Sequence, residues 1–326
     1  MTYLSLLLAM FAETVLPEGA FQRLRSWVDR VNQEMEINLE ALGAPGFAHL
    51  QWLAPVFIWL LGIYLLHHVL WTLSPLFSGL LSVTVLLYGL RYQHFNRVFT
   101  EAQLFLNQGD FFRARELVLS WIKDYDGREL HIHKPSELVF YAISYGAERA
   151  LRQYFALLFW FMLVPGPSGL VIYLMVHWSV MRENENWQTQ SFGEERPSMH
   201  DLWRANSLKA MITPGFVLYA LEWLPARLLA FTIGLLAQLD DAALAWRNAK
   251  SHSRFSNRAP LTSVFMVAVG LIQSVADTKT RFTQDSASLM PDTQVQALQL
   301  FRQLILKCAL VWLILAGLMA AGGLLP

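Results

Sequence analysis

Long apolar runs separated by polar segments are the main feature of the chain. The longest covers residues 154–181, in which 28 consecutive residues include no Asp, Glu, Lys or Arg and seven are aromatic. A helix of this length, rising about 1.5 Å per residue, exceeds the roughly 30 Å hydrocarbon core of a bilayer. The Pro165-Gly166-Pro167 break near its middle predicts one kinked span or two half-helices of a re-entrant hairpin. We expect lipid around this stretch and protein around its break.

Two other apolar regions predict ordinary membrane helices. Residues 50–90 contain no charged side chain and are interrupted by Ser74-Pro75, which predicts a helical hairpin turning at that point. Residues 304–326 predict a last membrane helix, with Lys307 at its entrance.

A further apolar region is interrupted by proline. Residues 208–239 contain Pro214 and Pro225 together with Glu222 and Arg227. Because proline removes a backbone donor and breaks helices, we expect only parts of this region deep in lipid. Residues 151–239 are therefore predicted to form broken membrane helices.

The polar segments between these runs are amphipathic. Residues 1–49 include apolar spacing from Phe21 to Val31 that suits an amphipathic helix, either on the membrane surface or packed against the bundle. Residues 91–150 predict helices joined by a turn, in which Gly109 serves the turn and Asp110 caps the following helix. Residues 240–303 are polar again. The prediction is an all-α, polytopic membrane helical bundle with Pro/Gly-broken or re-entrant helices and amphipathic cytoplasmic helices, forming a single domain over residues 1–326.

Composition supports a membrane protein and excludes other classes. Of the 326 residues, 55% are apolar and 15% charged, which lies outside the usual soluble range. Twenty-five acidic residues balance 25 basic ones, so there is no basic excess that would indicate nucleic acid. The single cysteine, Cys308, excludes an intrachain disulfide. Most Lys and Arg lie in the large polar segments, which the positive-inside rule places in the cytoplasm.

Two charged pairs are candidates for a polar cavity. Glu148 and Arg152 lie four residues apart, so on a helix they share one face and can pair. Glu222 and Arg227 flank a Trp-Leu-Pro-Ala sequence inside an apolar region, where a charge needs a partner. Both pairs fit a functional cavity, and both fit structural ion pairs. His177 joins them as a candidate because an imidazole at membrane depth must be used or paired, although simple packing also accounts for it.

The sequence shows no recognised catalytic constellation. There is no Gly-rich phosphate loop and no Gly-x-Ser-x-Gly elbow. His131 and His133 are two residues apart, a spacing that suits metal ligands only on extended backbone, and no cysteine lies near them. We therefore expect no metal site and assign no catalytic residue.

Several segments resemble one family of membrane proteins. Ala156-Leu157-Leu158-Phe159-Trp160-Phe161, Gly166-Pro167 and the Glu222-Trp223-Leu224-Pro225-Ala226-Arg227-Leu228 sequence are similar to the CobD/CbiB superfamily. That superfamily includes adenosylcobinamide-phosphate synthases of cobalamin biosynthesis, which use ATP to attach an aminopropanol arm to adenosylcobyric acid. It also includes the AmpE proteins, which are linked to β-lactamase regulation. The Arg152-Gln153-Tyr154-Phe155 sequence resembles the AmpE branch.

The polar motifs of a synthase are altered in this chain. Glu148 is retained, but Leu151-Arg152-Gln153 replaces the Ser-Asp-Gly of the synthases. An acid changed to a base cannot hold the same Mg²⁺ or phosphate geometry. After Asn257, which we include among the cavity candidates, Arg258-Ala259-Pro260-Leu261 replaces the expected Gly-Trp-Pro-Glu.

The resemblance predicts an AmpE-like protein of the bacterial inner membrane with a sensor, scaffold or regulatory role and no cofactor. The alternative is a divergent synthase, which would require ATP and Mg²⁺. A third hypothesis is a small-molecule or lipid binder with a polar pocket between Glu148, Arg152, Glu222 and Arg227. Expected partners are the lipid bilayer and either a protein or a small molecule in the cavity, while oligomerisation is left open and no nucleic acid is expected.

Overall fold

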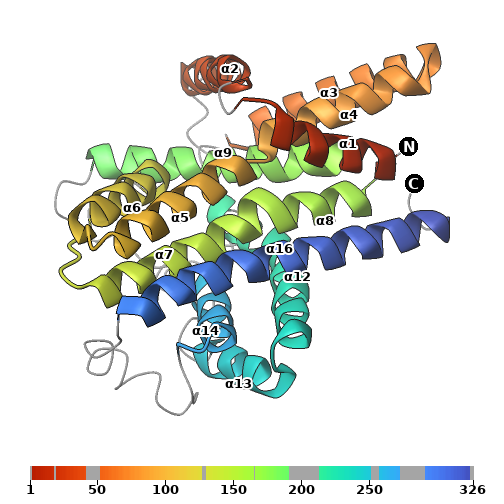
Figure 1. Ribbon diagram of the computed structural model, residues 1–326. Helices are drawn as coiled ribbons and strands as arrows, with labels where there is room; N and C mark the ends of the chain where they lie inside the picture. Colours follow the sequence, from red (N-terminus) through yellow and green to blue (C-terminus); the bar gives the residue numbers. More distant parts are fainter. Residues whose placement is uncertain are drawn as a thin grey trace. The chain divides into compact units, whose positions relative to one another are not determined.

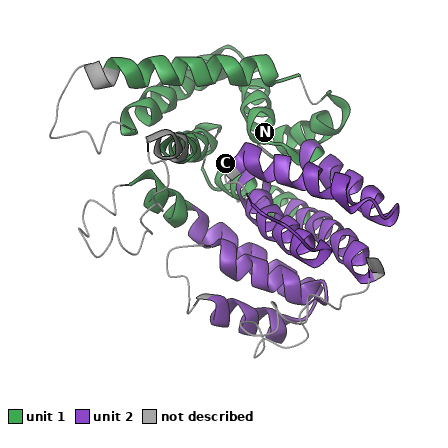
Figure 2. Ribbon diagram, turned by 90° about the vertical axis from the view of Figure 1, so that its left-hand side faces the viewer, with its two compact units in different colours: residues 1–93, 156–221, 314–326 green, residues 94–155, 222–313 purple. Residues whose placement is uncertain are grey.

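The chain folds into α-helices. This computed structural model describes residues 2–17, 20–41, 52–126, 130–164, 166–190, 213–250, 257–271 and 291–323, and every regular element within those ranges is helical (Figure 1). The helices group into two compact units, coloured separately in Figure 2. Unit 1 comprises residues 1–93, 156–221 and 314–326, and unit 2 comprises residues 94–155 and 222–313.

Four helical stretches within the described residues are long and apolar enough to cross a membrane. They are Leu53–Leu73, Pro75–Asn107, Pro214–Leu236 and Thr293–Ala321. Exposed Leu, Ile, Phe and Trp side chains cover much of their surface, including Phe57, Leu61 and Leu65 on the first and Leu310, Ile314 and Leu318 on the last. Apolar patches of this size are unstable in water, so these helices point to a membrane protein.

Unit 1 is built around the predicted helical hairpin. The segments α3 (Leu53–Leu73) and α4 (Pro75–Gly89) are separated by Ser74, whose hydroxyl accepts a hydrogen bond from the Leu76 backbone N–H. This confirms the turn predicted from Ser74-Pro75. The N-terminal segment forms two helices, α1 (Thr2–Val15), which packs on α4, and α2 (Gln22–Ala41), which packs on α3.

The central apolar stretch forms a second helical hairpin in unit 1. Helix α8 (Ala156–Leu163) ends before the break, and α9 (Ser168–Gln190) begins after it and packs against α8. Pro165 lies outside the described residues. Gly166 adopts a φ of +70°, a conformation that favours glycine, and the His67 ring lies close against it.

The central stretch is surrounded by protein to a greater extent than its composition predicts. Phe161, Leu170 and Tyr173 are at most 1% exposed, and neither α8 nor α9 is among the four candidate spans. Apolar composition is the same for a helix in lipid and for one inside a protein core, and here α3, α4 and α1 cover the hairpin. Much of residues 154–181 is therefore covered by other helices, and its position in the membrane stays a prediction.

Unit 2 holds the predicted helix-turn-helix. Helix α5 (Tyr92–Asn107) and helix α6 (Phe111–Asp126) are joined at Gly109, whose φ is +76°. The Asp110 carboxylate accepts a hydrogen bond from the Arg113 backbone N–H at 3.1 Å, so both predicted roles are confirmed. The chain continues through α7 (Pro135–Ala150) and a π-helical turn, η2 (Leu151–Phe155), directly into α8.

The remaining helices of unit 2 complete its core. They are α12 (Pro214–Leu236), which begins in unit 1, α13 (Leu239–Lys250), α14 (Arg258–Ala268) and α16 (Pro291–Ala321), whose last turns return to unit 1. Helix α14 packs on both α13 and α7. Aromatic rings fill the centre: Phe99 and Phe265 lie 5.3 Å and 4.8 Å from Phe301, measured between ring centroids. Helix α16 starts before the predicted boundary at residue 304, because its first turns are amphipathic and bury Phe301 in this core.

Pro225 does not break its helix, contrary to the sequence prediction. Helix α12 is continuous from Pro214, its first residue, to Leu236. Proline cannot donate to the carbonyl four residues earlier, which here belongs to Leu221. The indole N–H of Trp160 donates to that carbonyl instead, at 3.2 Å. A substitute donor thus satisfies the acceptor that Pro225 leaves open, which makes the proline tolerable.

We expect Trp160→Phe to destabilise the protein by about 1–3 kcal/mol, because the Leu221 carbonyl would then lack its substitute donor. The change keeps an aromatic ring and removes the N–H. Trp71→Phe is the matched control, since Trp71 is 49% exposed on α3. Unfolding midpoints in detergent, compared with the unmodified protein, measure both effects. Equal small shifts in the two variants would contradict the role given to the indole N–H.

Candidate functional site

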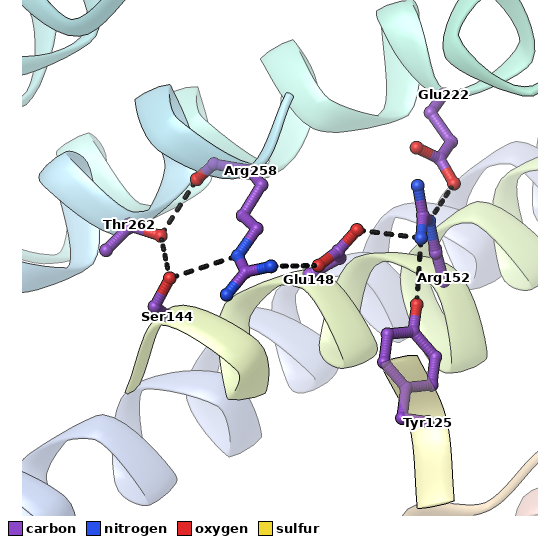
Figure 3. Close-up of polar contacts among 7 residues, drawn as sticks. All are labelled: Tyr125, Ser144, Glu148, Arg152, Glu222, Arg258 and Thr262. Carbon is purple, nitrogen blue, oxygen red and sulfur yellow. Dashed lines mark hydrogen bonds and ion pairs between the residues drawn. The ribbon is translucent and has the colours of Figure 1, made fainter. Parts of the chain in front are cut away.

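Charged and polar side chains from four parts of unit 2 meet in one buried cluster. We call it the charge cluster and define it as Tyr125, Ser144, Glu148, Arg152, Glu222, Arg258 and Thr262 (Figure 3). Helix α6 supplies Tyr125, and α7 with η2 supplies Ser144, Glu148 and Arg152 at intervals of four residues. Helix α12 supplies Glu222, and α14 supplies Arg258 and Thr262.

Arg152 is the central member of the charge cluster. Its Nη1 lies 2.7 Å from Glu148 Oε1 and donates to the Tyr125 hydroxyl oxygen at 2.9 Å. Its Nε donates to Glu222 Oε1 at 2.7 Å. One guanidinium therefore joins α6, α7 and α12 within unit 2, and Figure 3 shows it between the two carboxylates. Distances of this kind are typical of charge-assisted hydrogen bonds.

Arg258 extends the charge cluster at its other end. Its Nη1 lies 3.5 Å from the second oxygen of Glu148, and its Nε donates to the Ser144 hydroxyl at 3.2 Å. Its guanidinium also stacks on the Tyr145 ring, 3.6 Å from the centroid. Glu148 consequently pairs with an arginine through each of its two oxygens.

Arg149 positions the tyrosine of the charge cluster. Its guanidinium lies 4.5 Å from the centre of the Tyr125 ring and 4.2 Å from that of Trp121, and it donates to the Trp121 carbonyl at 2.6 Å. Such cation–π contacts hold the ring while its hydroxyl accepts from Arg152. Burial raises the pKa of Tyr125 above its usual value of 10.0, so the phenol stays neutral at physiological pH.

The charge cluster is largely shielded from solvent and electrically balanced. The Glu222 side chain is 3% exposed, Glu148 14% and Arg152 19%. Two carboxylates face two guanidinium groups, so the four charges sum to zero. Burying a charge is unfavourable unless it is paired and hydrogen-bonded, and this arrangement meets that requirement.

The structure brings together three of the six predicted cavity residues, Glu148, Arg152 and Glu222. The pairing of Glu148 with Arg152 follows the spacing that predicted it. Asn257 is buried at the start of α14, next to Arg258. Arg227 lies five residues from Glu222 along α12, about 140° further around the helix. It donates to the Trp223 carbonyl and stacks on the Trp223 ring at 3.6 Å.

His177 belongs to unit 1, whereas the charge cluster belongs to unit 2. It lies on α9, where its ring stacks on Tyr173 with the centroids 6.4 Å apart. The side chain is half-buried, and its use in a site stays a prediction.

Sequence reasoning missed four members of the charge cluster, which are Tyr125, Ser144, Arg258 and Thr262. The sequence pattern could have indicated Ser144, because residues 144, 148 and 152 follow one another at four-residue intervals on one helix face. No sequence signal connects Tyr125 or Arg258 to Glu148, since their contacts arise from the packing of α6 and α14 on α7.

Both carboxylates of the charge cluster form ion pairs with arginine side chains. Within the described ranges, no three His, Cys, Asp or Glu side chains gather as a metal-binding group. What the arrangement achieves is a rigid link between helices through charged hydrogen bonds.

No family model, curated protein or solved structure matches this chain.

Proposed function

We propose that this protein is an AmpE-like member of the CobD/CbiB superfamily in the bacterial inner membrane, with its large polar segments in the cytoplasm. In this proposal it acts as a sensor, scaffold or regulatory partner and does not catalyse the synthase reaction. The observation that carries the proposal is the position of Arg152, which bonds to Glu148 and Glu222 at once.

Electrostatics supports this proposal. A synthase that uses ATP needs carboxylate oxygens for Mg²⁺. At an effective dielectric constant of about 20, a divalent ion about 5 Å from one guanidinium is repelled by roughly 6–7 kcal/mol. Arg258 on the other oxygen of Glu148 adds to that repulsion. Glu148, the acid that the chain shares with the synthases, is thus poorly placed to hold a magnesium nucleotide.

A divergent synthase is the second candidate, and one observation favours it. Glu148, Arg152 and Glu222 converge, and Arg152 lies in a π-helical turn. Single π-helical turns inside α-helices occur frequently at functional sites. In this alternative, opening of the ion pairs on substrate binding would release the carboxylates.

Incubation of the purified protein with aminopropanol phosphate, adenosylcobyric acid, ATP and Mg²⁺ tests the proposal. We expect no adenosylcobinamide phosphate by mass spectrometry, while an authentic synthase run in parallel gives product. Product from this protein, lost in Glu148→Ala but retained in Arg113→Gln, would overturn the proposal and establish the second candidate. Arg113 is a suitable control because its side chain is 68% exposed and pairs locally with Asp110.

A further inference from the structure

An open groove of about 410 Å³ lies along helix α6 in unit 2. Its wall includes Phe112, Arg115, Glu116, Leu119 and Lys123 from the helix and His131 from the segment that leads to α7. None of these residues belongs to the charge cluster. A volume of this size falls in the range of pockets that hold small molecules.

Helix α6 has two distinct faces. Ala114, Val118, Trp121 and Ile122 are at most 2% exposed and pack into unit 2. The groove residues follow one another at spacings of three and four, which places them together on the opposite face. The groove is therefore a property of the outer face of α6, whose position is fixed by its buried face.

The groove combines positive charge with apolar surface. Arg115 and Lys123 carry permanent positive charges and His131 adds an imidazole, against one carboxylate, Glu116. The buried Nε of Arg115 has no hydrogen-bond partner among the described residues. Phe112 is 68% exposed. Arginine and lysine side chains are the usual ligands of phosphate groups in proteins, and an exposed ring offers a surface for an apolar group.

We propose that this groove binds a phosphate-bearing ligand that has an apolar or aromatic part. Arg115 and Lys123 contact the phosphate oxygens, His131 contributes a ring N–H, and Phe112 and Leu119 contact the apolar part. The same chemistry is found in the headgroup of an anionic phospholipid and in a soluble phosphate monoester. The proposal concerns a site separate from Arg152 and does not depend on the absence of synthase activity.

The test uses the full-length protein and two probes. The soluble probe is phenyl phosphate, titrated calorimetrically into protein in detergent. The lipid probe is phosphatidic acid, added to phosphatidylcholine nanodiscs that contain the protein, with bound lipid counted by native mass spectrometry. We expect saturable binding of at least one probe, weakened about 10-fold in Arg115→Gln and in Lys123→Gln, because each change removes a charge-assisted hydrogen bond to the phosphate. Arg113→Gln is the matched control, because it removes the same charge from α6 outside the groove wall.

The outcomes distinguish a soluble phosphate ligand from a lipid headgroup, and both from the absence of a binding site. Saturation by phenyl phosphate identifies a soluble ligand, and retention of phosphatidic acid alone identifies a lipid headgroup. Phenol and phosphatidylcholine, which lack the anionic monoester, should not saturate the site. Absence of saturable binding by both probes, or equal weakening in Arg113→Gln, would overturn the proposal. Near-native unfolding midpoints in the variants show that any lost binding is not lost folding.

Discussion

Arg152→Met is expected to destabilise the protein by about 3–5 kcal/mol, the usual effect of removing one partner from a buried ion pair. Methionine retains the length of the side chain but leaves Glu148 and Glu222 facing each other without a cation between them. The Tyr125 hydroxyl would lose its donor as well. The free energy of unfolding, measured by SDS titration with tryptophan fluorescence, reports the change.

Arg113→Met is the control for this variant. It removes the same guanidinium from an exposed ion pair with Asp110, and such pairs contribute about 0–1 kcal/mol. A loss in Arg152→Met no larger than in Arg113→Met would show that the charge cluster does not hold unit 2 together.

Gly169→Ala is expected to destabilise the protein by about 3 kcal/mol, at the upper end of the effect of overpacking. A Cβ built on Gly169 would lie 2.6 Å from the Cβ of Val164 and 2.7 Å from the carbonyl oxygen of Trp160. The backbone fixes the position of a Cβ atom as well as that of a carbonyl oxygen, so rotating a side chain relieves neither contact. The α8–α9 hairpin would have to open to accept one methyl group.

Gly62→Ala provides the comparison for the glycine variant. Nothing lies within 4 Å of a Cβ built at Gly62 on α3, and alanine favours a helix over glycine by about 1 kcal/mol. Unfolding midpoints in detergent should therefore fall in Gly169→Ala and stay level or rise in Gly62→Ala. A level midpoint in both variants would contradict the close packing of the hairpin.

Local features of the fold were predictable because short-range rules govern them. Ser74, Gly109 and Asp110 stand at helix boundaries where capping and turn geometry act within four residues. The pairing of Glu148 with Arg152 follows from helical periodicity in the same way.

Features that depend on tertiary contacts were not predictable. Residues 154–181 and helix α3 are both strongly apolar, yet Phe161 is fully buried and Leu61 is 60% exposed. Hydrophobicity measures preference against water and does not distinguish lipid from a protein interior. The sequence predicts a break at Pro225 because the substitute donor, Trp160, lies 61 residues from Leu221 along the chain. Arg258 likewise reaches Glu148 only through the packing of α14 on α7.

The most direct test is a double-mutant cycle between Arg152 and Glu222, built from Arg152→Met, Glu222→Gln and the combined variant. If Arg152 holds the two acids as a structural link, Glu222→Gln should cost little once Arg152 is gone, giving a coupling energy of about 2 kcal/mol. Additive single effects, with a coupling energy near zero, would contradict the account of Glu148, Arg152 and Glu222 as the charged link of unit 2.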